Sequence, residues 1–190
     1  MELPAGVKSA VVFAHGSGSG RLSPRNNYVA RVLREAGLGT LLFDLLTNEE
    51  DRDYLNRFNI DLLAERLAAA TVWLLGQAGN LVSLGYFGAS TGAAAALQAS
   101  VGHPEVRAIV SRGGRPDLAA DCLGSVTAPT LLIVGGRDEE VLMLNRQALA
   151  RIPAEKDLVV IQGATHLFEE PGTLEEVAEV ATNWFRRFLE

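Results

Sequence analysis

The sequence predicts an α/β fold, in which about six short strands form a mostly parallel, doubly wound sheet with helices on both faces. The chain of 190 residues alternates short apolar runs with longer amphipathic stretches throughout its length. The runs are rich in Val, Leu and Ile and are apolar on both faces, as expected of strands that are buried on both faces of a parallel sheet. Regular alternation of strand and helix patterns indicates consecutive strand–helix–strand units.

Each element follows from these patterns in chain order. Six strands are expected at residues 9–14, 40–45, 82–87, 106–111, 130–135 and 157–162. Five helices are expected at residues 25–36, 60–76, 91–101, 140–151 and 172–189. Ser23 and Pro24 form a typical helix start, and Gly37 follows the first helix where a C-terminal glycine belongs. We expect a single domain over residues 1–190, because no linker or internal repeat interrupts the alternation.

Composition limits the partners that the chain is expected to bind. The net charge is −6 and no cluster of Lys and Arg stands out, so we expect neither nucleic acid nor a membrane as a partner. The single cysteine, Cys122, cannot form a disulfide within the chain, and no N-terminal signal sequence is visible, which together indicate a cytoplasmic protein. His15, His103 and His166 lie far apart without nearby Cys, so we expect no metal and no cofactor. The oligomeric state is left open.

The stretch YFGASTG at 86–92 contains the motif Gly-x-Ser-x-Gly, with Ser90 between Gly88 and Gly92. The motif alone is only suggestive, but here an apolar strand precedes it and a helix of small residues follows it. In such a strained turn the serine hydroxyl is lifted out of the fold, and crowding excludes Cβ atoms two positions to either side. The stretch therefore predicts that Ser90 is a nucleophile.

A serine nucleophile needs a histidine base and an acid that orients the base. His166 is the predicted base, because it lies on the loop after the last strand, at the edge where ligand sites of open α/β sheets collect. Asp138, after the fifth strand, is the predicted acid and completes the order Ser, Asp, His. Asp117 is the second candidate. Glu139 and Glu140 are rivals, although acidic residues at these positions more often begin a helix.

Acyl transfer also needs donors for the negative oxygen of the tetrahedral intermediate. We expect one from the backbone of Thr91, directly after the nucleophile, and another from the loop HGSGSGR after the first strand. In that loop the backbone N–H of Ser17 is the predicted donor, with Gly16 as the close alternative. Arg112 and Arg115, in the stretch SRGGRPD, are candidates for binding an anionic part of the substrate, and the alternative is a solvated basic loop or a pair with Asp117.

Several longer stretches resemble the α/β-hydrolase superfamily and, within it, the small dienelactone hydrolase-like proteins, some of which are fused to a phosphoribosyltransferase domain. The stretches are VVFAHGSGSGRLSPRN, LLFDLLT, GYFGASTGAAAAL, SRGGRPDLA, LLIVGGRDEEV and GATHLFEEPG. The resemblance covers essentially the whole chain. It implies the strand order 2-1-3-4-5-6 and a catalytic triad of Ser90, Asp138 and His166.

Two departures from the family pattern shape the expected function. Dienelactone hydrolases proper use a cysteine nucleophile, whereas this chain has Ser90, which favours a serine esterase. Residues 112–129 are too few for a lid domain, so an open site for small carboxylic esters is expected. An amidase or lactonase with the same triad remains an alternative. A further alternative, of another class, is a non-catalytic module that binds a ligand or serves a phosphoribosyltransferase partner.

Overall fold

The computed structural model describes residues 1–79, 81 and 83–190, and within them it contains one six-stranded sheet. All neighbouring strands pair in parallel, and their order across the sheet is β2-β1-β3-β4-β5-β6. This confirms the predicted fold class and strand order. The strands are β1 (Ser9–Ala14), β2 (Gly39–Leu42), β3 (Ser83–Ala89), β4 (Val106–Arg112), β5 (Thr130–Gly135) and β6 (Lys156–Ile161).

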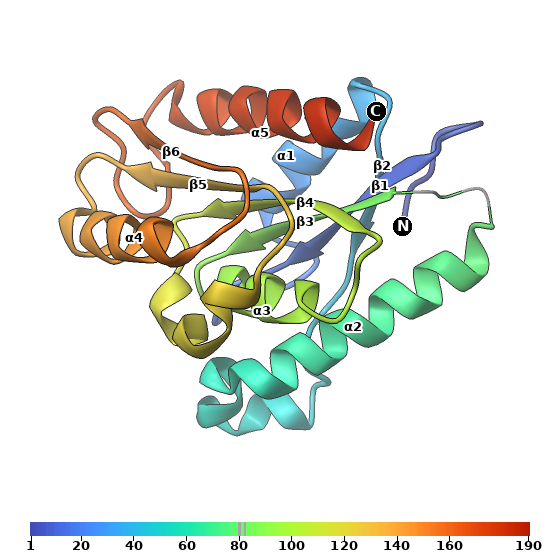
Figure 1. Cartoon of the computed structure of the whole chain (residues 1–190), viewed down its shortest axis with the longest axis horizontal. Helices are drawn as coiled ribbons and strands as arrows, with labels where there is room; N and C mark the ends of the chain where they lie inside the picture. The colour runs from blue at the N-terminus through green and yellow to red at the C-terminus, as the bar shows by residue number, and fades with distance from the viewer. Residues whose placement is uncertain (80, 82) are drawn as a thin grey trace.

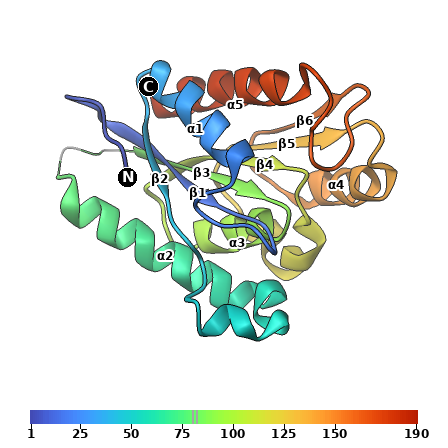
Figure 2. The ribbon, with the colours of Figure 1, turned by 180° about the vertical axis from the view of Figure 1, so that it is seen from behind.

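Helices cover both faces of this sheet (Figures 1 and 2). One face carries α1 (Pro24–Glu35) and α5 (Thr173–Leu189), and the other carries α2 (Ile60–Gln77), α3 (Thr91–Ser100) and α4 (Glu139–Arg151). The predicted cap of the first helix is confirmed, since the hydroxyl of Ser23 accepts a hydrogen bond from the N–H of Asn26 at 3.3 Å. In the described residues, 3₁₀ segments lie in the connections at η1 (Glu50–Arg52), η2 (Tyr54–Phe58) and η3 (Pro116–Ser125).

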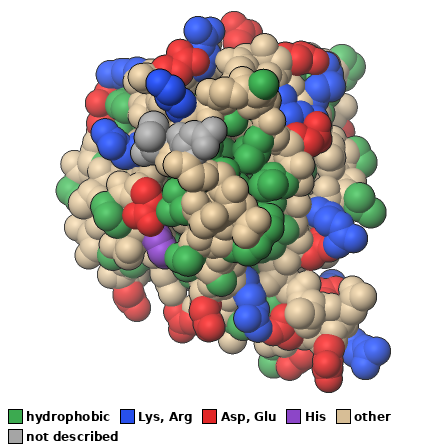
Figure 3. Space-filling model, turned by 90° about the vertical axis from the view of Figure 1, so that its right-hand side faces the viewer, with side chains coloured by type: hydrophobic (Ala, Val, Ile, Leu, Met, Phe, Trp, Pro, Cys, Tyr) green, Lys and Arg blue, Asp and Glu red, His purple; other side chains and the backbone are tan. Residues whose placement is uncertain are grey.

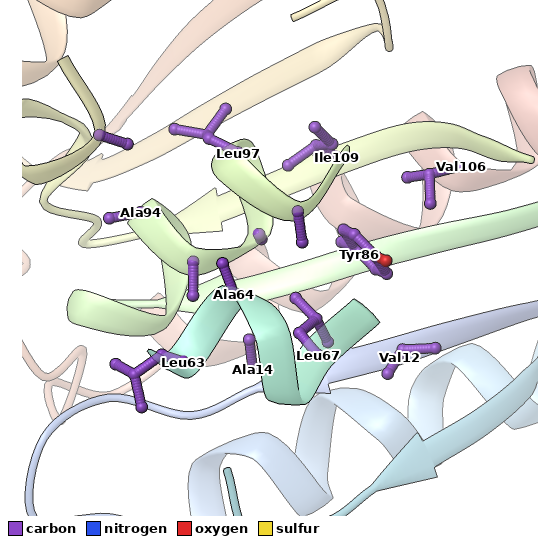
Figure 4. Close-up of a cluster of buried hydrophobic side chains, with 14 of the residues drawn as sticks. Val12, Ala14, Leu63, Ala64, Leu67, Tyr86, Ala94, Leu97, Val106 and Ile109 are labelled. Carbon is purple, nitrogen blue, oxygen red and sulfur yellow. The ribbon is translucent and has the colours of Figure 1, made fainter. Parts of the chain in front are cut away.

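The alternation of side chains along the strands builds two separate hydrophobic cores. In β1, Val11 and Phe13 pack with α1 and α5, whereas Val12 and Ala14 pack with α2 and α3. Figure 4 shows the second of these cores, where Val12 and Tyr86 of the sheet lie next to side chains of α2 and α3. Fully burying one large apolar side chain stabilises the fold by about 1.5–3 kcal/mol, so both cores contribute substantially.

The structure differs most from the predicted elements at two strands, β2 and β3. The strand expected at 40–45 ends at Leu42, because the chain turns away and the N–H of Leu45 donates to Nε2 of His15 at 2.9 Å. The strand expected at 82–87 begins at Ser83 and continues to Ala89, directly before the elbow serine. Residue 82 itself lies outside the described residues. The connection after β4 holds only the ten-residue η3, so it contains no lid domain.

Charges are mixed on the face at the amino ends of β1 and β3. Figure 3 shows acidic and basic side chains interspersed there around hydrophobic ones. No helix in the described ranges combines the length and apolar character needed to cross a membrane.

Substitution of Gly92 tests how tightly α3 packs against β1. A Cβ atom at Gly92 would overlap the carbonyl oxygen of Ala14 and lie 2.5 Å from that of His15. We expect Gly92→Ala to lower the free energy of unfolding by about 3 kcal/mol or more, because backbone atoms must move apart. Gly76→Ala is the matched control, since a Cβ atom there meets nothing within 4 Å and alanine favours the helix by roughly 0.5–1 kcal/mol.

Urea denaturation of both variants measures the two effects. Equal stability of Gly92→Ala and wild type would contradict the close packing.

Candidate active site

The nucleophile elbow is a crowded turn between β3 and α3. Ser90 has a left-handed backbone with φ of 51° and ψ of −121°, which is uncommon for a residue with a Cβ atom. A Cβ atom at Gly88 would lie 2.7 Å from the carbonyl oxygen of Gly92 and 2.8 Å from the nitrogen of Ala93. Both motif glycines are therefore required by contact, as the sequence predicts. The turn leaves Ser90 half-buried at the carboxyl edge of the sheet.

His166 and Asp138 come from neighbouring loops and are in direct contact. Nδ1 of His166 lies 2.6 Å from Oδ2 of Asp138. Because a carboxylate accepts, this geometry assigns the proton to Nδ1 and leaves Nε2 free to take another. Asp138 occupies the N-cap position of α4, yet its side chain makes no capping hydrogen bond there. Its carboxylate is used by the histidine instead.

Gly135 allows these two loops to approach each other. A Cβ atom at Gly135 would lie 2.5 Å from the carbonyl oxygen of Ala164 and 2.6 Å from that of Thr165. The N–H of Arg137 donates to the same Ala164 carbonyl at 2.9 Å. The loop that carries His166 is thus held against the loop that carries Asp138, and sequence reasoning did not single out this glycine.

The other candidates for base and acid either bind other groups of the protein or lie exposed to solvent. Nε2 of His15 accepts the N–H of Leu45, and Nδ1 of His103 lies 3.5 Å from a carboxylate oxygen of Glu105. Asp117 forms an ion pair with Arg115 at 2.7 Å. The rival acids Glu139 and Glu140 lie exposed in the first turn of α4.

A pocket of about 180 Å³ lies beside the nucleophile. Its lining includes Ser90, His166, Ser17 and Arg112, which the sequence predicts, and also Arg25. No hydrogen bond joins the hydroxyl of Ser90 to His166 within the described residues. Such contacts are often long in unliganded sites and tighten only around substrate. Larger hollows, of about 650, 590 and 350 Å³, are lined by other residues.

The two predicted oxyanion donors have different surroundings. Thr91 is the first residue of α3, and the first N–H groups of a helix have no acceptor within it. The N–H of Ser17, by contrast, already donates to Oγ1 of Thr91 at 3.0 Å. Both residues therefore lie next to the elbow, but the predicted donor, the N–H of Ser17, already has an acceptor within the protein.

The two arginines predicted to bind substrate differ in their position relative to the pocket. Arg115 donates from Nε and an NH2 group to the carboxylate of Asp117, at 2.9 and 2.7 Å, and does not line the pocket. Arg112 does line it and is only 7% exposed. Burial, together with the nearby positive charge of Arg25, lowers the pKa of Arg112 to about 10, so the guanidinium stays charged at neutral pH.

Arg112 carries its charge without a carboxylate partner in the described part of the chain. Its NH2 group makes a long hydrogen bond of 3.4 Å to Oδ1 of Asn26, and its Nε is buried without any partner. The guanidinium also lies 5.8 Å from the ring centre of Phe168. Asn26 was missed from the sequence because it sits on α1, far from Arg112 along the chain.

Comparison with solved structures places the chain in a family. A crystal structure of a dienelactone hydrolase from Anabaena variabilis is 55% identical and superimposes with a TM-score of 0.94, covering 99% of this chain and 90% of that one. The chain belongs to the dienelactone hydrolase family. The esterase domain of a Rhodothermus marinus protein, 22% identical over 100% of this chain and 92% of that one, has a TM-score of 0.78 and shares the fold. No protein-family model matches the chain.

This member of the family also resembles part of a longer protein. Curated proteins from two Mycobacterium tuberculosis strains are 61% identical to it over 187 residues, which is 97% of this chain and 42% of theirs. They carry the provisional name phosphoribosyl transferase. The chain thus spans less than half the length of the curated relatives it matches.

The contact between Asp138 and His166 can be tested without a substrate. A proton held between Nδ1 and a carboxylate resonates far downfield in proton NMR, and we expect one such signal in the wild type. Asp138→Asn should abolish it, because an amide cannot hold the histidine as a carboxylate does, and should lower any turnover roughly 10³–10⁴-fold.

Asp117→Asn is the matched control and should keep both the signal and the turnover. A signal that survives Asp138→Asn but disappears in Asp117→Asn would reverse the assignment of the acid.

Proposed function

We propose that the chain is a serine hydrolase that cleaves small carboxylic esters through an acyl-enzyme. The observation that carries the proposal is the elbow itself, where Ser90 is held at a φ of 51° beside a pocket that it shares with His166. His166 in turn contacts Asp138 at 2.6 Å. Nucleophile, base and orienting acid are the parts that this chemistry requires.

The proposed reaction has two halves. His166 takes the proton of Ser90 as the hydroxyl oxygen attacks the ester carbonyl, and the resulting oxyanion is stabilised by donors at the N-terminus of α3. His166 then gives the proton to the leaving alkoxide, and the acyl group stays on Ser90. Water, deprotonated by His166, attacks this ester, and the carboxylic acid leaves as Ser90 recovers its proton. Asp138 stabilises the charged histidine in each half.

A cysteine nucleophile finds no support in the structure. Cys122 lies on η3, where its Sγ donates to the carbonyl oxygen of Ala119 at 3.2 Å. Burial raises the pKa of this thiol, which opposes formation of the nucleophilic thiolate. Ser90 occupies the elbow, so we assign the attack to an oxygen nucleophile.

Two alternatives make different demands on the same site. An amidase or lactonase would use the same side chains, and rates on an ester and its matched amide or lactone separate these activities. A non-catalytic module, such as one that serves a phosphoribosyltransferase partner, needs neither the strained Ser90 nor its contact partners His166 and Asp138. The elbow therefore favours catalysis.

Replacement of Ser90 tests the proposed function directly. We expect Ser90→Ala to reduce hydrolysis of p-nitrophenyl acetate and butyrate by several powers of ten, about the effect of removing a triad serine. Ser111→Ala is the matched control, because Ser111 is a buried serine at the end of β4 that does not line the pocket. Circular dichroism checks that both variants fold. Full activity in a folded Ser90→Ala protein would exclude the mechanism.

The charge of the pocket favours esters that carry an anionic group. Arg112 and Arg25 both line the pocket, and among the described residues only Arg25 has a carboxylate partner, Glu169 at 3.1 Å. A buried guanidinium that lacks its counter-ion is costly to the fold, and a bound carboxylate or phosphate would supply that counter-ion. We therefore propose that Arg112 selects substrates whose acyl or leaving group is anionic.

Arg112→Met should separate the stability of the protein from its substrate preference. Removal of a buried charge should raise the free energy of unfolding by about 1–3 kcal/mol, while kcat/KM for an anionic ester such as a succinate monoester should fall about tenfold or more. A neutral ester of the same size should be hydrolysed nearly as before.

Arg115→Met serves as the surface control and should affect neither ester. Equal losses on both esters in Arg112→Met would contradict a role in charge selection.

A further inference from the structure

The loop that follows β1 (residues 15–21, the oxyanion loop) is fixed against the elbow by several contacts. A Cβ atom at Gly16 would lie 2.9 Å from Cβ of Ser90, so residues 16 and 90 are in direct contact. His15 holds the loop from behind, since its Nδ1 lies 3.0 Å from the carbonyl oxygen of Gly16 and its Nε2 accepts the N–H of Leu45 at 2.9 Å. Ser17, the next residue, is therefore held at the pocket that Ser90 also lines.

The backbone N–H of Ser17 points to an acceptor within the protein. It donates to Oγ1 of Thr91 at 3.0 Å, and Thr91 is only 2% exposed. A buried N–H and its acceptor are costly to separate, because each loses its partner away from water. This N–H therefore holds the loop on α3 instead of being free for a substrate oxygen.

The side chain of Ser17 has no such engagement. Ser17 is half-buried and lines the pocket together with Ser90 and His166. No hydrogen bond involves its hydroxyl within the described ranges. A serine hydroxyl can rotate to donate towards a new acceptor, and it keeps its own proton when it does so.

We propose that the oxyanion hole combines the backbone N–H of Thr91 with the side-chain hydroxyl of Ser17. Oγ1 of Thr91 positions Ser17 by accepting its N–H. This assignment rests on the proposed function, because the hydroxyl stabilises the oxyanion that forms when Ser90 attacks a carbonyl. Ser17 donates one hydrogen bond and takes no part in proton transfer.

Ser17→Ala removes the hydroxyl and keeps the backbone N–H, so it separates the two possible donors. We expect kcat to fall about 10²-fold with KM nearly unchanged, as for loss of one oxyanion donor. Ser17→Thr should restore at least a third of the wild-type kcat, because it restores the hydroxyl. Affinity for a trifluoromethyl ketone, which forms the tetrahedral adduct, should fall in parallel with kcat/KM.

The outcomes distinguish this inference from the proposed function. Wild-type activity that depends on Ser90 but persists within threefold in Ser17→Ala would overturn the side-chain donor and return the role to a backbone N–H. Loss of activity in Ser17→Ala without weaker ketone binding would also overturn it. Absence of Ser90-dependent activity in the wild type would instead refute the proposed function itself. Thermal melting of each variant excludes unfolding as the cause of any lost activity.

Discussion

The left-handed backbone of Ser90 is the constraint on which the rest of the site depends. A residue with a Cβ atom is strained there by about 1–3 kcal/mol, so neighbouring contacts must hold it. The N–H of Ser90 donates to the carbonyl of Arg112, and its own carbonyl accepts from Ala93 and Arg115. Because Gly88 has no Cβ atom, the following helix can pack directly against it. The fold thus stabilises a backbone conformation at Ser90 that is unfavourable for the residue alone.

The strand order converts distant segments into one site. Because β1 lies beside β3 and β5 lies beside β6, the loop with Ser17 reaches the elbow, and the loop with Asp138 reaches His166. The parallel direction of all six strands puts these loops on the same edge. Arg112, at the end of β4, completes the arrangement between them.

The sequence predicts the fold and much of the site, because both depend on local signals. Strand and helix patterns locate the elements to within a few residues, and the motif Gly-x-Ser-x-Gly marks the strained turn at Ser90. What the sequence cannot supply are contacts between distant segments. The tether from Ser17 to Thr91 and the approach of Asn26 to Arg112 join α1, α3, β4 and the β1 loop, and no spacing in the chain encodes them. The pair of Arg115 and Asp117, by contrast, is local, and the sequence already offers it as the alternative to substrate binding.

One covalent experiment tests the central claim most directly, namely that this elbow makes Ser90 a nucleophile. A fluorophosphonate reacts with an activated serine by forming an oxygen–phosphorus bond and releasing fluoride. Intact mass spectrometry of the folded wild type should show a single adduct, and peptide mapping should place it on Ser90. No adduct, or an adduct on another residue while Ser90 stays unmodified, would contradict the account.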